Sequence, residues 1–175
     1  RDQYKAVLGW SAKTVDSLAD RLIFREFAND NFDVNEIFRA NNPDVFFDSA
    51  VLSALIASCS FVYISNGEDE IPRLQVIEAS NATGVIDETT GLLKEGYAVR
   101  ELDENNKPSV EAYFTGDQTA FYYADKNVEN FSLDNPTGHP LLVPIIHRPD
   151  AVRPFGRSRI TRAGMYWQRN AKRTL

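Results

Sequence analysis

The sequence predicts an α+β fold, with N-terminal helices followed by an antiparallel β meander and a C-terminal helix. Two observations lead to this prediction. Apolar residues recur at helical spacing through the first third of the chain. From residue 60 onward, short apolar and aromatic runs alternate with turn sequences, which is typical of strands. Because helices and strands occupy separate blocks instead of alternating, the pattern favours α+β over a doubly wound parallel sheet.

We expect a single domain, since the 175 residues are enough for one ordinary hydrophobic core. Residues 1–59 are expected to be mainly helical, 60–148 to form the antiparallel sheet, and 149–175 to form a basic turn and a helix. The apolar content of 43% and charged content of 25% are typical of a globular protein. No apolar run is long enough to span a bilayer, so we expect no membrane partner. The only methionine is Met165, and we therefore expect a fragment of a longer protein.

The first helix is predicted to begin at an N-cap, either Ser11 or Thr14. Its apolar face consists of Val15, Leu18, Ala19, Leu22 and Ile23. A second, short helix is predicted to begin at Asp33, because Glu36 follows at the spacing of a capping box. It should end by Asn42.

A third helix is predicted to begin at Pro43, which suits the first helical position after an Asn42 cap. Its apolar face consists of Phe47, Ala50, Val51, Ala54, Leu55 and Ser58. Strands are then predicted over residues 61–64, 74–79, 97–102, 110–114, 121–124 and 141–146, each bounded by turn residues.

The last helix is predicted to be capped by Ser158. Its apolar stripe consists of Ile160, Gly164, Trp167, Ala171 and Leu175. Its opposite face carries Arg162, Arg169 and Arg173. A helix of this kind is expected to pack on one partner and to meet acidic groups elsewhere.

Charge is distributed very unevenly along the chain. Residues 147–175 contain eight arginines and lysines against one acid, Asp150, a net charge of +7. Because the whole chain carries −6, residues 1–146 carry −13. Such asymmetry predicts surfaces for different partners, or an acidic and a basic face that meet between copies.

A short motif lies within the basic segment. Residues 153–160 have the sequence RPFGRSRI, follow the strand at 141–146, and precede a helix that ends in NAKRTL. This succession resembles the portal proteins of tailed bacteriophages of the long-tailed type, in which a PFGRS turn leads from the last strand of the wing domain to a helix. Residues 15–22 and the stretch from 42 to 64 look like the helices and first strand of the same wing.

The resemblance implies the N-terminal wing region of a phage or prophage portal protein. Such proteins form a ring of twelve subunits at one capsid vertex, through which a terminase packages double-stranded DNA and on which neck and tail are built. The protein would be part of the virion, assembled in the bacterial host cytoplasm. It would not be an enzyme, because ATP hydrolysis belongs to the terminase. Stem, clip and DNA-contacting loop would lie beyond Leu175.

By the same resemblance, the wing-to-stem turn and its subunit interface would use the basic segment. The residues concerned are Arg153, Phe155, Gly156, Arg157, Ser158, Arg159, Arg162 and Arg169. Gly156 is expected to supply a backbone conformation that other residues resist, and Phe155 to hold the turn by apolar contact.

Two other functional classes stay open. The basic helix is compatible with a stand-alone nucleic-acid-binding module, for which eight phosphate contacts predict a salt slope of about −7. The acidic remainder of the chain would repel DNA, which favours contacts between subunits. A hydrolase would need paired carboxylates. The candidates all lie in predicted turns, and they are the acidic run Glu68, Asp69 and Glu70 and the set Asp87, Glu88, Asp103 and Glu104.

Metal and cofactor chemistry finds little support in the sequence. His139 and His147 have no acid at ligand spacing, and no nucleophile or phosphate-binding motif is present. We therefore expect neither a metal nor a cofactor. Cys59, the single cysteine, is expected to be a buried small hydrophobe in a protein of a reducing compartment.

Overall fold

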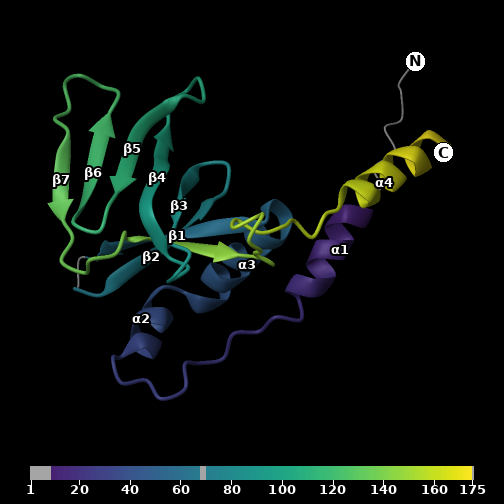
Figure 1. Ribbon diagram of the computed structural model, residues 1–175, viewed down its shortest axis with the longest axis horizontal. Helices are drawn as coiled ribbons and strands as arrows, with labels where there is room; N and C mark the ends of the chain where they lie inside the picture. Colours follow the sequence, from purple (N-terminus) through teal and green to yellow (C-terminus); the bar gives the residue numbers. More distant parts are fainter. Residues whose placement is uncertain (1–8, 68–69, 175) are drawn as a thin grey trace.

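The computed structural model of the chain describes residues 9–67 and 70–174. The described residues form four helices and eight strands. Three helices precede the strands and one follows them, so the α+β prediction is confirmed (Figure 1).

Helix α1 (Trp10–Ala19) is shorter than predicted, and Leu22 and Ile23 lie beyond its end. Its last turn carries no basic residue, and the charges of Asp16 and Asp20 oppose continuation because they lie at the negative end of the helix dipole. The predicted caps are wrong. Gly9 occupies the N-cap position, the Thr14 hydroxyl donates to the Trp10 carbonyl within the helix, and Ser11 contacts the last helix.

Helix α2 (Val34–Ala40) has Asp33 at its N-cap position, but the predicted capping box does not form. A capping side chain acts from an extended backbone, whereas Asp33 is left-handed with φ +55°. The cap comes instead from Asp30, whose carboxylate accepts from the Val34 and Asn35 amides at 2.7 and 2.8 Å.

Helix α3 (Pro43–Ala57) begins at the predicted proline. Asn42 precedes it without a side-chain cap bond, because its backbone is also left-handed, with φ +51°. Thr161, not Ser158, caps helix α4 (Arg162–Thr174): its hydroxyl oxygen accepts from the Gly164 amide at 3.0 Å.

The strands form two antiparallel sheets instead of one meander. The first has the order β2-β1-β8 and consists of β1 (Cys59–Asn66), β2 (Pro72–Glu78) and β8 (Leu142–Ile146). The second is a true meander of β3 (Ala82–Ile86), β4 (Leu93–Leu102), β5 (Pro108–Phe114), β6 (Gln118–Tyr123) and β7 (Phe131–Asp134). Strands β3 and β7 were not predicted from the sequence. Pro144 is accommodated because β8 is an edge strand, where a missing N–H is tolerated.

The core lies between the two sheets, and α3 covers the outer face of the first. Alternate residues of β1 point to opposite faces: Phe61 and Tyr63 belong to the inter-sheet core, whereas the Ser60 hydroxyl donates to the Ala50 carbonyl of α3 at 2.8 Å. The core also contains Cys59, Ile77, Ala82, Leu93, Ala98, Ala112, Phe114, Phe121 and Leu142. We call this three-layered unit the sandwich.

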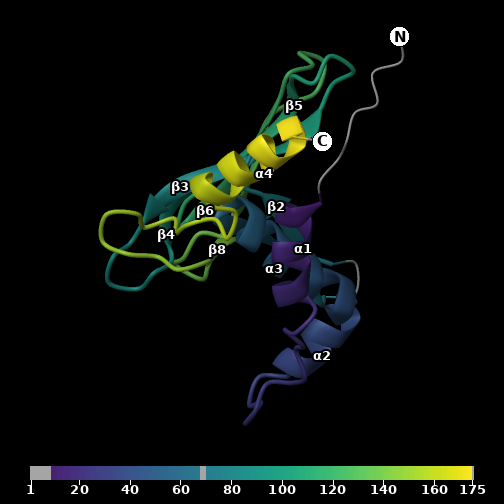
Figure 2. The ribbon, with the colours of Figure 1, turned by 90° about the vertical axis from the view of Figure 1, so that its right-hand side faces the viewer.

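Helices α1 and α4 pack against each other and project to one side of the sandwich (Figure 1). In Figure 2, which is turned so that this side faces the viewer, α4 lies in front of the sheets with α1 beside it. The basic turn, residues 147–161, connects β8 to α4.

Candidate functional site

The basic turn closes the C-terminal end of α3. The Arg159 amide donates to the Leu55 carbonyl at 2.7 Å, and the Ser158 hydroxyl donates to the Ile56 carbonyl. These carbonyls belong to the last turn of α3, where no intrahelical donor exists. Ser158 does not cap α4 because the helix begins four residues later, at Arg162, and the Ser158 hydroxyl oxygen accepts from the Ile160 amide at 2.9 Å. The contact with α3 also places a basic segment at the negative end of a helix, which is favourable.

Gly156 adopts a conformation that only glycine fits in this turn. Its φ is +77°, and an added Cβ would lie 2.2 Å from the His147 carbonyl oxygen and 2.8 Å from Ile146 Cγ2. The prediction of a special backbone at Gly156 is therefore confirmed. Next to it, the half-buried Phe155 ring lies 6.0 Å from the ring of Phe61, centroid to centroid, so the turn is packed onto the sandwich core.

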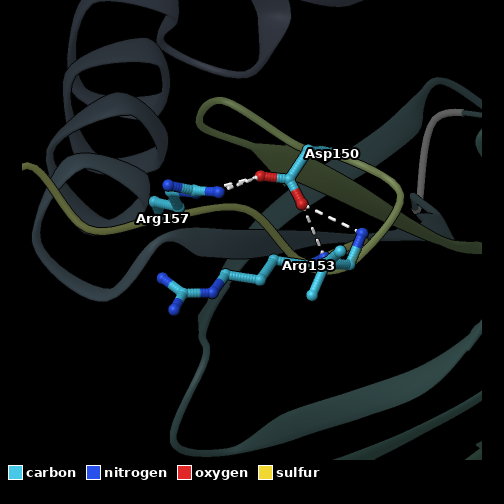
Figure 3. Close-up of polar contacts among 4 residues, drawn as sticks. Asp150, Arg153 and Arg157 are labelled. Carbon is cyan, nitrogen blue, oxygen red and sulfur yellow. Dashed lines mark hydrogen bonds and ion pairs between the residues drawn. The ribbon is translucent and has the colours of Figure 1, made fainter.

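Asp150 organises the turn by binding both side chain and backbone (Figure 3). Its Oδ2 accepts from Arg157 Nε at 3.0 Å, and its Oδ1 accepts from the Arg153 and Val152 amides at 2.8 and 3.0 Å. The Arg157 hydrogen bond, followed by the Arg153 amide, lowers the pKa of Asp150. Asp150 was not predicted as a site residue, although an aspartate that binds its own backbone two residues on is a familiar turn signal.

The other arginines of the basic segment whose side chains the structure describes are exposed to solvent. Of the predicted site residues, Arg153, Arg159, Arg162 and Arg169 are exposed, and none forms an ion pair with a described residue. The side chain of Arg153 extends away from the Asp150 carboxylate (Figure 3). The fold thus gathers Arg153 to Arg159 in one turn, whereas Arg162 and Arg169 lie on α4.

Helix α4 is joined to α1 by partly buried hydrogen bonds that were not predicted from the sequence. The Gln168 side-chain oxygen accepts from the Ser11 amide at 3.1 Å and from the Ser11 hydroxyl at 2.6 Å. Part of the predicted apolar stripe, Ile160, Gly164 and Trp167, lines a cleft with α1. Leu175 and the side chain of Arg173 lie outside what the structure describes.

The opposite face of α4 is exposed in the part of the chain that the structure describes. Arg162, Met165, Tyr166 and Arg169 share it, since they stand at i, i+3, i+4 and i+7. Met165 and Tyr166 are 51% and 63% exposed. We call these four residues the α4 outer face. Exposed large side chains between cations are the composition expected of an interaction surface.

The turn carboxylates do not converge on one site. Asp87 and Asp103 lie beyond opposite ends of β4, which are about 30 Å apart for a ten-residue strand. Each carboxylate accepts from amides of its own turn: Asp87 from Thr89, and Asp103 from Asn105 and Lys107. Glu68 and Asp69 lie outside the described residues. Among the described residues, no three His, Cys, Asp or Glu side chains gather as a metal site. His147 supports the basic turn, with Nδ1 2.7 Å from the Arg157 carbonyl oxygen.

No protein-family model and no curated protein matches this sequence. Within the described ranges, no helix combines the length and the apolar character needed to cross a bilayer.

Proposed function

We propose that this chain is a structural subunit of a phage or prophage portal ring, and that it forms the wing of that subunit. The observation that carries the proposal is the RPFGRSRI turn: it leads from the last strand of the sandwich to a projecting basic helix, the succession for which the sequence resembles portal proteins. In this role the sandwich is a rigid body, and the basic turn fixes the direction in which α4 leaves it.

The contacts of the turn support a mechanical role. Gly156 lies against the end of β8, Ser158 binds the end of α3, and Asp150 holds Arg157. The turn is therefore fastened to the sheet, to the helix and to itself. Such a joint transmits the position of the sandwich to the helix that follows, as a connector between wing and channel requires.

The proposed partners are those of a head-to-tail connector. They are other copies of the chain, the terminase, the capsid and neck proteins, and the double-stranded DNA that passes through the ring. The assembled protein would reside in the virion after assembly in the bacterial cytoplasm, and its contribution would be structural instead of catalytic.

Negative-stain microscopy combined with light scattering tests this proposal. The sample is the protein expressed from its complete gene. We expect closed rings with a central channel and a mass of about twelve subunits, as the portal resemblance implies. A discrete monomer or dimer under every assembly condition would overturn the proposal.

A nucleic-acid-binding module is the second candidate, and the free arginines favour it. Arg148, Arg153, Arg159, Arg162 and Arg169 form no ion pair with a described residue. If all five met phosphates, the logarithm of affinity would fall against the logarithm of salt concentration with a slope of about −4.5. Fluorescence anisotropy with a DNA duplex measures this slope. Arg162→Ala with Arg169→Ala should reduce its magnitude by about 2, and absence of binding at low salt would reject the module.

A further inference from the structure

A groove lies between the end of α1 and the first half of α3, away from the contact of α1 with α4. It has acidic edges and an apolar floor. Its volume is about 430 Å³. The acids are Asp16 and Asp20 from the end of α1, and Asp44 and Asp48 from the start of α3. The half-buried side chains of Phe24, Phe47 and Leu52 form the floor, and the exposed Leu22 and Ile23 extend it. We call this the acidic groove.

Asp44 lies in the first turn of α3, where the helix dipole stabilises it, but the other acids of the groove have little compensation from described residues. Asp16 and Asp20 lie at the negative end of the α1 dipole, in a last turn without any basic residue. They are also one helical turn apart, as are Asp44 and Asp48, so each pair repels itself. None of the four carboxylates forms an ion pair with a described residue. A cationic partner would relieve all of these unfavourable terms.

The α4 outer face has the matching charge and shape. Arg162 lies at the positive end of its own helix, where no acid offsets it. Arg162 and Arg169 are about 10 Å apart along the axis, and Met165 and Tyr166 lie between them on the same face. The outer face therefore presents an apolar centre flanked by cations, whereas the groove presents an apolar floor flanked by carboxylates.

The groove of the same copy is out of reach for this face. Gln168 binds Ser11 on α1, and on a helical projection the outer face points away from Gly164 and Trp167, which line the α1–α4 cleft. One side of α4 is therefore held against its own α1, and the other side does not face the groove of the same copy.

We propose that the α4 outer face of one copy docks into the acidic groove of a second copy. The two surfaces differ, so the contact is head-to-tail, and repetition with a suitable rotation closes a ring. This inference rests on the proposed function, because it names the surfaces through which the copies of a ring would meet. Since charge dominates the match, association should weaken as salt rises.

Charge reversal provides a test in which neither variant is expected to unfold. The groove variant is Asp16→Lys with Asp20→Lys, and the helix variant is Arg162→Glu with Arg169→Glu. Lysines at the end of α1 and a glutamate at the start of α4 each suit the dipole of their own helix. A control variant, Glu104→Lys with Glu129→Lys, changes the net charge by as much as the groove variant, in two exposed turns of the second sheet.

Sedimentation velocity over a concentration series measures association of the whole chain. We expect the wild type and the control to associate, each reversed variant to associate at least tenfold more weakly, and an equimolar mixture of the two reversed variants to recover association. Recovery is expected because the groove variant retains the wild-type α4 outer face and the helix variant retains the wild-type acidic groove, so one complementary contact can form between the two variants.

Two results would overturn the inference: reversals that behave like the control, or a mixture that stays dissociated. If neither reversal weakens association and microscopy still shows rings of the complete protein, the docking contact is wrong but the portal proposal stands. Conversely, recovery in the mixture without any ring from the complete protein would retain the contact and reject the portal proposal.

Discussion

The sandwich and the α1–α4 pair use large apolar side chains in opposite ways. In the sandwich, Phe61 and Phe114 are 1% and 0% exposed, and full burial of a side chain of this size stabilises a fold by about 1.5–3 kcal/mol. In the pair, Trp10 and Trp167 are 54% and 67% exposed. The difference indicates that the sandwich carries the stability of the chain, whereas the pair keeps apolar surface available for a partner.

The α4 outer face and the acidic groove carry opposite charges, and no ion pair between described residues joins them within one copy. Among the described side chains, the ion pair of the basic segment is Arg157 with Asp150, which both belong to the same turn. The arginines of α4 and the aspartates of the acidic groove stay exposed. The asymmetry seen in the sequence is therefore preserved on the folded surface.

Truncating one aromatic side chain in each region should give the largest difference in the free energy of unfolding. We expect Phe114→Ala to lower the free energy of unfolding by about 3–5 kcal/mol, because it leaves a cavity between the sheets. Trp167→Ala should cost less than about 1 kcal/mol, since most of its surface is already in water. Urea denaturation followed by circular dichroism measures both values, and similar losses would refute the division of roles.

The joint between the regions should be sensitive to one methyl group. Gly156→Ala is expected to cost about 2–3 kcal/mol, since it adds a clash to an unfavourable φ. Gly91→Ala is the matched control: its φ is +73°, but an added Cβ meets nothing within 4 Å, so about 1 kcal/mol is expected. Equal losses in thermal or urea unfolding would show that the approach to His147 is unimportant.

Release of α4 from α1 should not change the stability of the sandwich. Gln168→Ala removes two hydrogen bonds to Ser11, each worth about 1 kcal/mol. We expect trypsin to cleave after Arg162 and Arg169 several-fold faster, with no change in the urea midpoint of the sandwich. Gln118→Ala, at an exposed position on β6, is the control. A lowered midpoint in Gln168→Ala would mean that the two regions unfold together.

The smallest effect concerns a tyrosine on the second sheet. Tyr97 donates to the Glu111 carboxylate, and this bond raises the pKa of Tyr97 to about 12. Because the folded-state pKa lies above the ordinary value of 10.0, the stabilisation is complete below about pH 10 and is lost as pH rises through about 12.

We expect Tyr97→Phe to cost less than about 1 kcal/mol at pH 8, and this difference from the wild type should vanish by pH 12. Tyr122→Phe, which alters a 45% exposed ring, is the control. Urea titrations across this pH range provide the measurement, and a constant difference would contradict the assigned hydrogen bond.

Local patterns predicted the elements whose formation is decided locally. Pro43 marked the start of α3, and the turn residues marked most strands, because proline geometry and turn chemistry act within a few residues. The pairing of β1 with β8 could not be predicted from local patterns, since Phe61 and Pro144 are brought together by the whole fold. Strand β7 was missed although Phe131 and Leu133 alternate with polar residues, because a run of only four residues is the shortest in which such alternation indicates a strand.

The same distinction between local and long-range determinants applies to the helix caps and the site residues. Gly156 was predicted because its backbone requirement belongs to the turn itself. Ser158 was misassigned because α4 begins only at Arg162, where Thr161 provides the cap, whereas Ser158 lies in the preceding turn and donates to a carbonyl of α3. The acidic groove could not be predicted, because Asp16 and Asp48 come from helices that only tertiary packing brings together.

Hydrogen–deuterium exchange of the whole chain at low and high protein concentration tests the division between stable body and recognition surface most directly. We expect amides of α4, of the end of α1 and of the start of α3 to gain protection at high concentration, while those of β1, β4 and β5 stay unchanged. Protection that is independent of concentration in α4 and the acidic groove, or that rises equally throughout the sandwich, would contradict it.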